Sequence, residues 1–219
     1  MKVGRKLKNI SYRSFPETGF FLAFILFIVL VVLFFCMGGI DPFYEIIINN
    51  KIGNEKKDII SMYVFIDTVL IIGWFLGWIG IYDYMIQKNN KYCLLIFIVG
   101  IMGPILDFIE NEISWVIIHD VYTPQSILNN VWLIIQRLSY IFPYLGAILL
   151  GISIIKEKKY NKYYSLFLIY GSIIALSGLY FDMLFIPSQA WWPLFFLLSG
   201  IFIIKNKPID NKSTKPSMV

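Results

Sequence analysis

Six apolar stretches, each long enough to cross a lipid bilayer, constrain the fold of this chain more than any other feature. They lie near residues 19–39, 60–86, 92–118, 128–155, 163–186 and 190–205. A membrane-spanning helix needs about 20 residues, because each residue adds about 1.5 Å along the helix axis. The alternating pattern of a membrane β-barrel is absent. The sequence therefore predicts an all-α fold, a polytopic transmembrane helix bundle with six membrane-spanning helices.

Composition supports this class and leaves no room for a soluble domain. Of the 219 residues, 58% are hydrophobic and only 15% are charged, which is typical of membrane proteins. We expect three parts: a basic cytoplasmic segment at 1–18, a transmembrane domain at 19–205 and a disordered cytoplasmic tail at 206–219. The first apolar stretch is too long for a signal peptide and no small-x-small cleavage site follows it, so we expect an uncleaved helix.

Basic residues gather in every second connection between the stretches. Five precede the first stretch, the connections after the second and fourth stretches hold two and four, and the C-terminal end from Lys205 onwards holds four. The intervening connections hold three, none and none. This asymmetry predicts a multi-pass protein of the cell membrane with both termini cytoplasmic. The net charge of +5 is thus an orientation signal, and we expect no nucleic-acid partner.

The third stretch carries a row of polar side chains that hydrocarbon would not tolerate. Asp107, Glu110, Asn111 and Ser114 are spaced i, i+3, i+4 and i+7, which places them on one face of a helix. Each ionisable group in a membrane costs roughly 2.5 to 3.5 kcal/mol on insertion scales, and such groups usually face a protein interior. The row therefore predicts an interior wall, whereas Glu112 lies off this face.

Helical rise places polar residues of other stretches at a similar depth, in the outer half of the bilayer. Arg137 is the only basic residue in the interior of a stretch, and we expect it to pair with a carboxylate, which its planar fork suits. One arginine cannot neutralise all the carboxyl groups, so a proton, a cation or water should complete the site. The site predicted from sequence comprises Asp107, Glu110, Asn111, Arg137, Asp67, Gln136, Asp182 and Tyr140.

The sequence carries none of the familiar motifs of catalytic or metal chemistry considered below. His119 is the only histidine, so the histidine-rich metal sites of membrane desaturases and site-2 proteases are excluded. There is no CxxC pair, no nucleotide-binding glycine loop and no Gly-x-Ser-x-Gly elbow. We therefore expect no metal site and no cofactor, and no catalytic residues are assigned.

Three functions stay open at this point. The favoured one is a site that binds or transports a proton, a cation or a small polar ligand, because acids predominate and nucleophile arrangements are lacking. The second is an enzyme acting on a lipid or isoprenoid head group, with a carboxyl as general acid or base. The third is an accessory or scaffold protein whose polar network only fixes helix packing. Expected partners are the lipid bilayer and a small polar or cationic ligand, and association into a homo-oligomer is left open.

Overall fold

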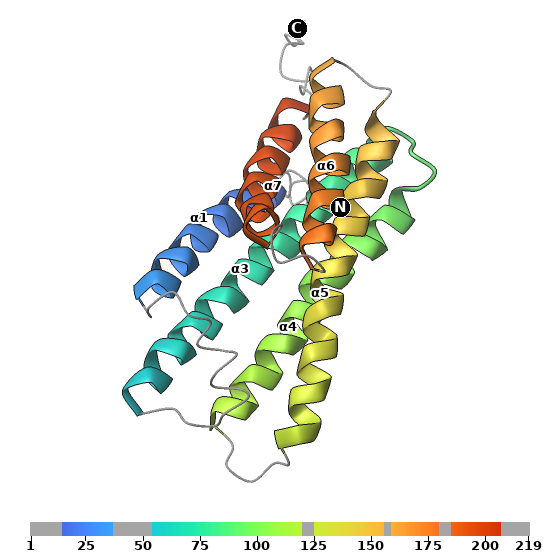
Figure 1. Cartoon of the computed structure of the whole chain (residues 1–219). Coiled ribbons are helices and arrows are strands. Elements are labelled where there is room, and N and C mark those ends of the chain that lie inside the picture. The colour runs from blue at the N-terminus through green and yellow to red at the C-terminus, as the bar shows by residue number, and fades with distance from the viewer. Residues whose placement is uncertain (1–14, 37–53, 120–124, 156–158, 180–184, 207–219) are drawn as a thin grey trace, which may run out of the picture.

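The computed structural model describes residues 15–36, 54–119, 125–155, 159–179 and 185–206, and every regular element in these ranges is an α-helix (Figure 1). The all-α prediction is therefore confirmed for the described part of the chain. The six helices are α1 Phe15–Cys36, α3 Asn54–Gln87, α4 Cys93–His119, α5 Gln125–Ile154, α6 Lys159–Gly178 and α7 Phe185–Asn206.

Four of these helices are long and apolar enough to cross a membrane. The qualifying segments are Thr18–Phe35 in α1, Asp58–Gln87 in α3, Cys93–Val116 in α4 and Asn130–Ile154 in α5. In α7 the apolar segment is shorter, Ala190–Asn206. The helical apolar segments are compatible with a membrane protein, while the count of six spans and the orientation of the termini stay predictions.

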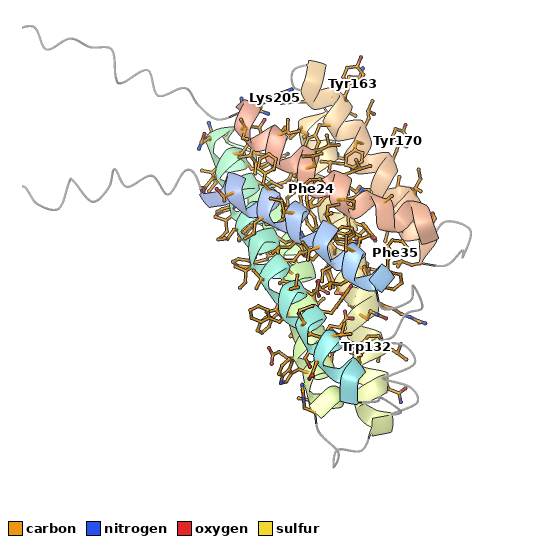
Figure 2. All side chains as sticks on the ribbon, turned by 90° about the vertical axis from the view of Figure 1, so that its left-hand side faces the viewer. Phe24, Phe35, Trp132, Tyr163, Tyr170 and Lys205 are labelled. Atoms are coloured by element: carbon orange, nitrogen blue, oxygen red, sulfur yellow. The ribbon has the colours of Figure 1, made fainter. Side chains whose placement is uncertain are left out.

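The helices form a closed ring in the order of the chain. Each helix packs against the next, α7 closes the ring on α1, and α3 also contacts α7. Figure 1 shows that α3, α4 and α5 extend well beyond the ends of α6 and α7 on one side. The lengths agree, because α3 and α5 have 34 and 30 residues and α6 and α7 only 20 and 22. Figure 2 places Trp132 of α5 in this three-helix extension and Lys205 and Tyr163 at the opposite end.

Glycines set the closest approach within the ring. A Cβ atom on Gly19 of α1 would lie 2.6 Å from the backbone oxygen of Gly73, and one on Gly73 would lie 2.8 Å from that of Gly19. The two backbones are therefore in direct contact, as the small-x-x-x-small spacing of Gly73 and Gly77 predicts. Gly151 likewise lets α5 contact α6, because a Cβ there would lie 2.9 Å from the backbone oxygen of Ser165.

Large aromatic side chains fill the middle of the ring. This aromatic core joins α7 to α3 and α5 through close ring contacts, such as Trp74 with Trp192 at 4.8 Å and Tyr144 with Trp191 at 4.9 Å between centroids. Aromatic pairs at these distances add about 0.5 to 1.5 kcal/mol each beyond the area that they bury. The core comprises Trp74, Trp78, Tyr144, Trp191, Trp192, Phe195 and Phe196, all at most 5% exposed.

The last two helices differ from the predicted spans. The fifth span was predicted at 163–186, whereas α6 runs over Lys159–Gly178, after which the amide of Leu179 bonds back to the carbonyl of Leu176 at 3.1 Å in a tighter turn. The sixth span was predicted to begin at 190, but α7 begins at Phe185. Pro187 fits there because a proline lacks only an amide that has no intrahelical partner in the first turn.

Several sequence predictions concern residues that lie outside the described ranges. They include most of the basic N-terminal segment, the C-terminal tail and residues 37–53 of the first long connection.

Candidate functional site

The polar row of α4 lies on the side of the helix that faces its neighbours. Asn111 and Ser114 are 6% and 1% exposed, and Asp107 and Glu110 are half-buried. Glu112 is exposed, as its position off the row predicts. The helical spacing thus correctly separated the inward residues of α4 from the outward ones.

α3 supplies the first partner of this row. The side-chain amide of Asn111 donates a hydrogen bond to Oδ2 of Asp67 at 2.9 Å and a longer one to Oγ1 of Thr68 at 3.4 Å. Thr68 in turn donates to the carbonyl of Val64 at 2.8 Å, which fixes its hydroxyl. The predicted meeting of Asp67 and Asn111 is therefore seen, although Asp67 is only half-buried within the chain.

α5 closes the row from the other side. The hydroxyl of Ser139 donates to Oε2 of Glu110 at 3.2 Å and also lies 2.8 Å from the carbonyl of Gln136. Nearer the N-terminal end of α5, the indole N–H of Trp132 donates to the hydroxyl of Ser114 at 2.9 Å, and that hydroxyl bonds the carbonyl of Glu110. Three helices therefore meet at one polar layer.

Electrostatic interactions link the acidic groups of this layer to one another. Asp107 interacts with the charges of both Asp67 and Glu110. Tyr140 of α5 interacts with Asp107 and Glu110 and also with Tyr63 of α3. We call Asp67, Asp107 and Glu110 the carboxyl cluster. It lies between α3, α4 and α5, with Tyr140 leading from it to the aromatic core, where its ring centroid is 6.2 Å from that of Trp192.

Arg137 does not join the carboxyl cluster. It is exposed, and no ion pair joins it to an acidic side chain within the ranges that the structure describes. The contact of Gly151 with Ser165 sets the antiparallel register of α5 and α6, which places the end of α6 at Gly178 within about a turn of Arg137. The expected pairing with a carboxylate is therefore not seen among the described residues, and it stays a prediction for the acidic groups outside them.

Two further residues of the predicted site, Gln136 and Asp182, do not contribute a side chain to the described polar layer. Gln136 is half-buried, and its backbone carbonyl accepts the bond from Ser139. Asp182, which was expected inside the fifth helix, is outside the described ranges.

Sequence reasoning missed several polar partners, namely Tyr63, Thr68, Trp132 and Ser139. Trp132 and Ser139 are spaced i and i+7, with Gln136 between them, so one stripe of α5 carried the signal. They were overlooked because hydroxyl and indole groups are common in membrane helices, whereas charged groups are rare.

A second polar contact joins the N-terminal part of α3 to the C-terminal end of α4. Ser61 and Nε2 of His119 are 3.2 Å apart, and the His119 ring packs on Trp115 with centroids 4.5 Å apart. Within the described residues, no group of three or more His, Cys, Asp or Glu side chains is arranged to hold a metal ion.

Comparisons with known proteins add no assignment to this geometry. The sequence matches no protein-family model, and comparisons with curated proteins and with solved structures find no similar chain.

Proposed function

We propose that this chain is a multi-pass protein of the cell membrane with six spans and cytoplasmic termini, and that its carboxyl cluster binds a monovalent cation or a proton. The lengths of the two short helices support six spans, because 20 residues of α6 rise about 30 Å, which is the thickness of the hydrocarbon core. The lysines of the described residues support the orientation, since Lys88, Lys91 and Lys162 lie in or beside the connections expected inside.

The observation that carries the cation proposal is the uncompensated charge of Asp67 and Asp107. Among the described residues, neither carboxyl is paired with a lysine or an arginine, and the bond that Asp67 accepts comes from the neutral amide of Asn111. Asp107 instead interacts electrostatically with two further acids, Asp67 and Glu110. Like charges repel in a low-dielectric layer, and a cation or proton taken up between them relieves the repulsion.

The chemistry of the surrounding groups favours a monovalent ligand. The carboxyl groups come from two helices, with the hydroxyls of Ser139 and Tyr140 beside them. These oxygens can accept hydrogen bonds from an ammonium group or pass a proton. An ammonium ion, an alkali cation and a proton therefore fit the proposal.

Thermal unfolding of the purified protein in lipid nanodiscs tests the proposal. Sodium, potassium, methylammonium and tetramethylammonium chlorides are titrated at constant ionic strength, with N-methyl-D-glucamine replacing each ion, and the series is repeated across a pH range. At a concentration of 100 times Kd, a ligand that binds only the folded state stabilises it by about 2.7 kcal/mol. We expect a saturable rise of the unfolding midpoint with one of these cations or with protons.

Variants locate the effect. Asp107→Asn and Asp67→Asn should abolish the saturable shift, whereas Glu112→Gln, on the exposed side of α4, should keep it. A midpoint that responds to none of the cations and not to pH would contradict the proposal. A shift of unchanged size in Asp107→Asn would contradict it as well.

A purely structural network is the second candidate, and specific contacts favour it. The bonds from Asn111 to Asp67, from Trp132 to Ser114 and from Ser139 to Glu110 each tie two helices together. On this reading, Asp107→Asn would leave every ligand response unchanged and alter stability alone. We do not extend the proposal to lipid chemistry, because the hydroxyl of Ser139 beside Glu110 also lies 2.8 Å from the backbone carbonyl of Gln136, which holds it in the helix.

A further inference from the structure

Four of the five basic residues with described side chains lie at one end of the helix ring. They are Lys88, Lys91, Lys162 and Lys205, and all four are exposed. Asp83 is the one acidic residue with a described side chain at that end. Among the described side chains, this end therefore carries a clear excess of positive charge. The proposed orientation uses only the number of lysines in each connection, so their arrangement in space is a separate observation.

Three aromatic rings pack in a row across α3, α7 and α6 at this end. The rings of Tyr84 and Phe202 have centroids 4.9 Å apart, and Phe202 stacks on Tyr164 at 4.5 Å. The hydroxyl groups of Tyr164 and Ser199 share a hydrogen bond of 2.7 Å, which fixes the Tyr164 ring against α7. All three rings are buried. We call Tyr84, Phe202 and Tyr164 the aromatic ladder, and it holds the ends of three helices in fixed positions.

Each of three lysines lies beside one ring of the aromatic ladder. Nζ of Lys88 is 5.8 Å from the centroid of Tyr84, which is within the range of a cation–π interaction. Lys162 lies two residues before the ladder ring of α6, and Lys205 lies three residues after that of α7, about one helical turn. We call Lys88, Lys162 and Lys205 the lysine rim.

The start of α6 and the end of α7 are tied together beside this rim. The side-chain amides of Asn161 and Asn206 donate to each other's side-chain oxygens at 3.4 and 3.3 Å. Lys162 and Lys205 are the chain neighbours of these two residues, so the amide pair keeps the backbones of the two lysines close together. Figure 2 shows Lys205 and Tyr163 at this same end of the molecule.

An exposed apolar face of α6 leads away from the lysine rim. Tyr163 and Tyr170 are 64% and 62% exposed, and their spacing of seven residues places them on one face of α6, from which they project outwards in Figure 2. Ile174 continues this face one turn further, and Ile204 is exposed next to Lys205 on α7. Exposed tyrosines are typical of the head-group level of a membrane. A ligand that suits both the rim and this face has a negatively charged head and apolar tails.

We infer that the lysine rim binds the phosphate head group of an anionic phospholipid, whose acyl chains lie along the exposed face of α6. Lysine binds phosphate as a point charge, so several ammonium groups on different helices can act on one head group. Near a membrane surface, each lysine strengthens the attraction of anionic lipid by about fivefold. The site is separate from the carboxyl cluster, because the 20 residues from Asp67 to Gln87 span about 30 Å along α3.

Lipid retention by the intact protein, measured by native mass spectrometry, tests the inference. The protein is equilibrated in mixed micelles that contain equal amounts of phosphatidylglycerol and phosphatidylcholine with the same acyl chains. We expect the wild type to retain phosphatidylglycerol over phosphatidylcholine by at least about fivefold, the factor for one lysine. Equal retention of the two lipids would overturn the inference. Excess inorganic phosphate should leave the retained lipid in place, and its release by phosphate would show that the rim takes a free anion and would overturn the choice of a lipid.

Single glutamine variants locate the bound lipid. Lys88→Gln, Lys162→Gln and Lys205→Gln each remove one charge of the rim, and each should lower the retention ratio by about fivefold. Lys91→Gln is the matched control, because Lys91 is also exposed and its Nζ lies 4.8 Å from a ring, that of Tyr92, which is not part of the aromatic ladder. It should change the ratio by less than about twofold if the rim, and not the overall charge, attracts the lipid.

Two outcomes of the variant series would overturn the site. The first is a wild-type ratio in all three rim variants, which would show that the lysine rim does not hold the lipid. The second is an equal fall of the ratio in Lys91→Gln and in the rim variants, which would show that the lipid responds only to the total charge at this end. The unfolding midpoint of each variant is measured alongside, and the wild-type ratio alone decides the matter if a variant does not fold.

Discussion

The bond between Asn111 and Asp67 offers a sharp energetic test of how the carboxyl cluster is held. Asn111→Ala removes the donor that lies 2.9 Å from Oδ2 of Asp67 and the longer contact to Thr68. A hydrogen bond to a charged group contributes about 1.5 to 3 kcal/mol in water-soluble proteins, while measured interhelical bonds in a membrane average about 0.6 and reach about 1.7 kcal/mol. Asn111 is nearly fully buried and Asp67 only half-buried, so we expect a loss of about 1 to 2 kcal/mol.

A double-mutant cycle isolates the pair from the rest of the cluster. Free energies of unfolding are measured in mixed micelles for the wild type, Asn111→Ala, Asp67→Ala and the double variant. We expect a coupling energy of about 0.5 to 1.7 kcal/mol. Glu112→Ala, an exposed residue next to Asn111 in the chain, should change stability by less than about 0.5 kcal/mol. A coupling energy indistinguishable from zero would refute the view that this bond ties α3 to α4.

Three further predictions follow from contacts elsewhere in the ring. Gly73→Ala places a Cβ against the α1 backbone and should cost about 1 to 3 kcal/mol more than Gly200→Ala, where the three atoms nearest to the Cβ all belong to the movable ring of Phe21. Equal unfolding free energies of the two variants would contradict the backbone contact. Trp132→Phe removes the bond to Ser114 and should lower the unfolding free energy by about 1 kcal/mol, and an unchanged value would show that this bond contributes nothing. Arg137→Gln should change stability by less than about 0.5 kcal/mol because the side chain is exposed, whereas a loss of several kcal/mol in the same assay would show a buried ion pair.

The sequence predicted the helical class because apolar runs of this length have one stable form in lipid. It also predicted the inward face of α4, because Asp107, Asn111 and Ser114 repeat at the helical period and the structure covers that face. Helix ends were harder to place. An apolar run continues past Gly178, so composition alone did not mark where α6 stops.

The partners of the acidic groups were also hard to predict from charge. Arg137 was expected to pair with a carboxyl because opposite charges attract, yet its side chain is exposed and no ion pair joins it to an acidic group among the described residues. Reasoning from charge also overlooked Ser139. This residue is two positions further along α5 than Arg137 and therefore lies on nearly the opposite side of the helix. Hydroxyl and amide donors contact Glu110 and Asp67, and such neutral groups give no charge signal in a sequence.

The most direct test of the central claim is the electrical current that accompanies binding. Protein reconstituted in one orientation is adsorbed on a solid-supported membrane, and the cation that stabilises the protein in the nanodisc titration, or a proton, is raised by a rapid solution exchange. Charge that enters a site within the membrane produces a transient current even without transport. The account predicts a saturable transient in the wild type and in Glu112→Gln, and its loss in Asp107→Asn. A transient of the same size in Asp107→Asn, or none in the wild type, would contradict the assignment of the carboxyl cluster as a cation site.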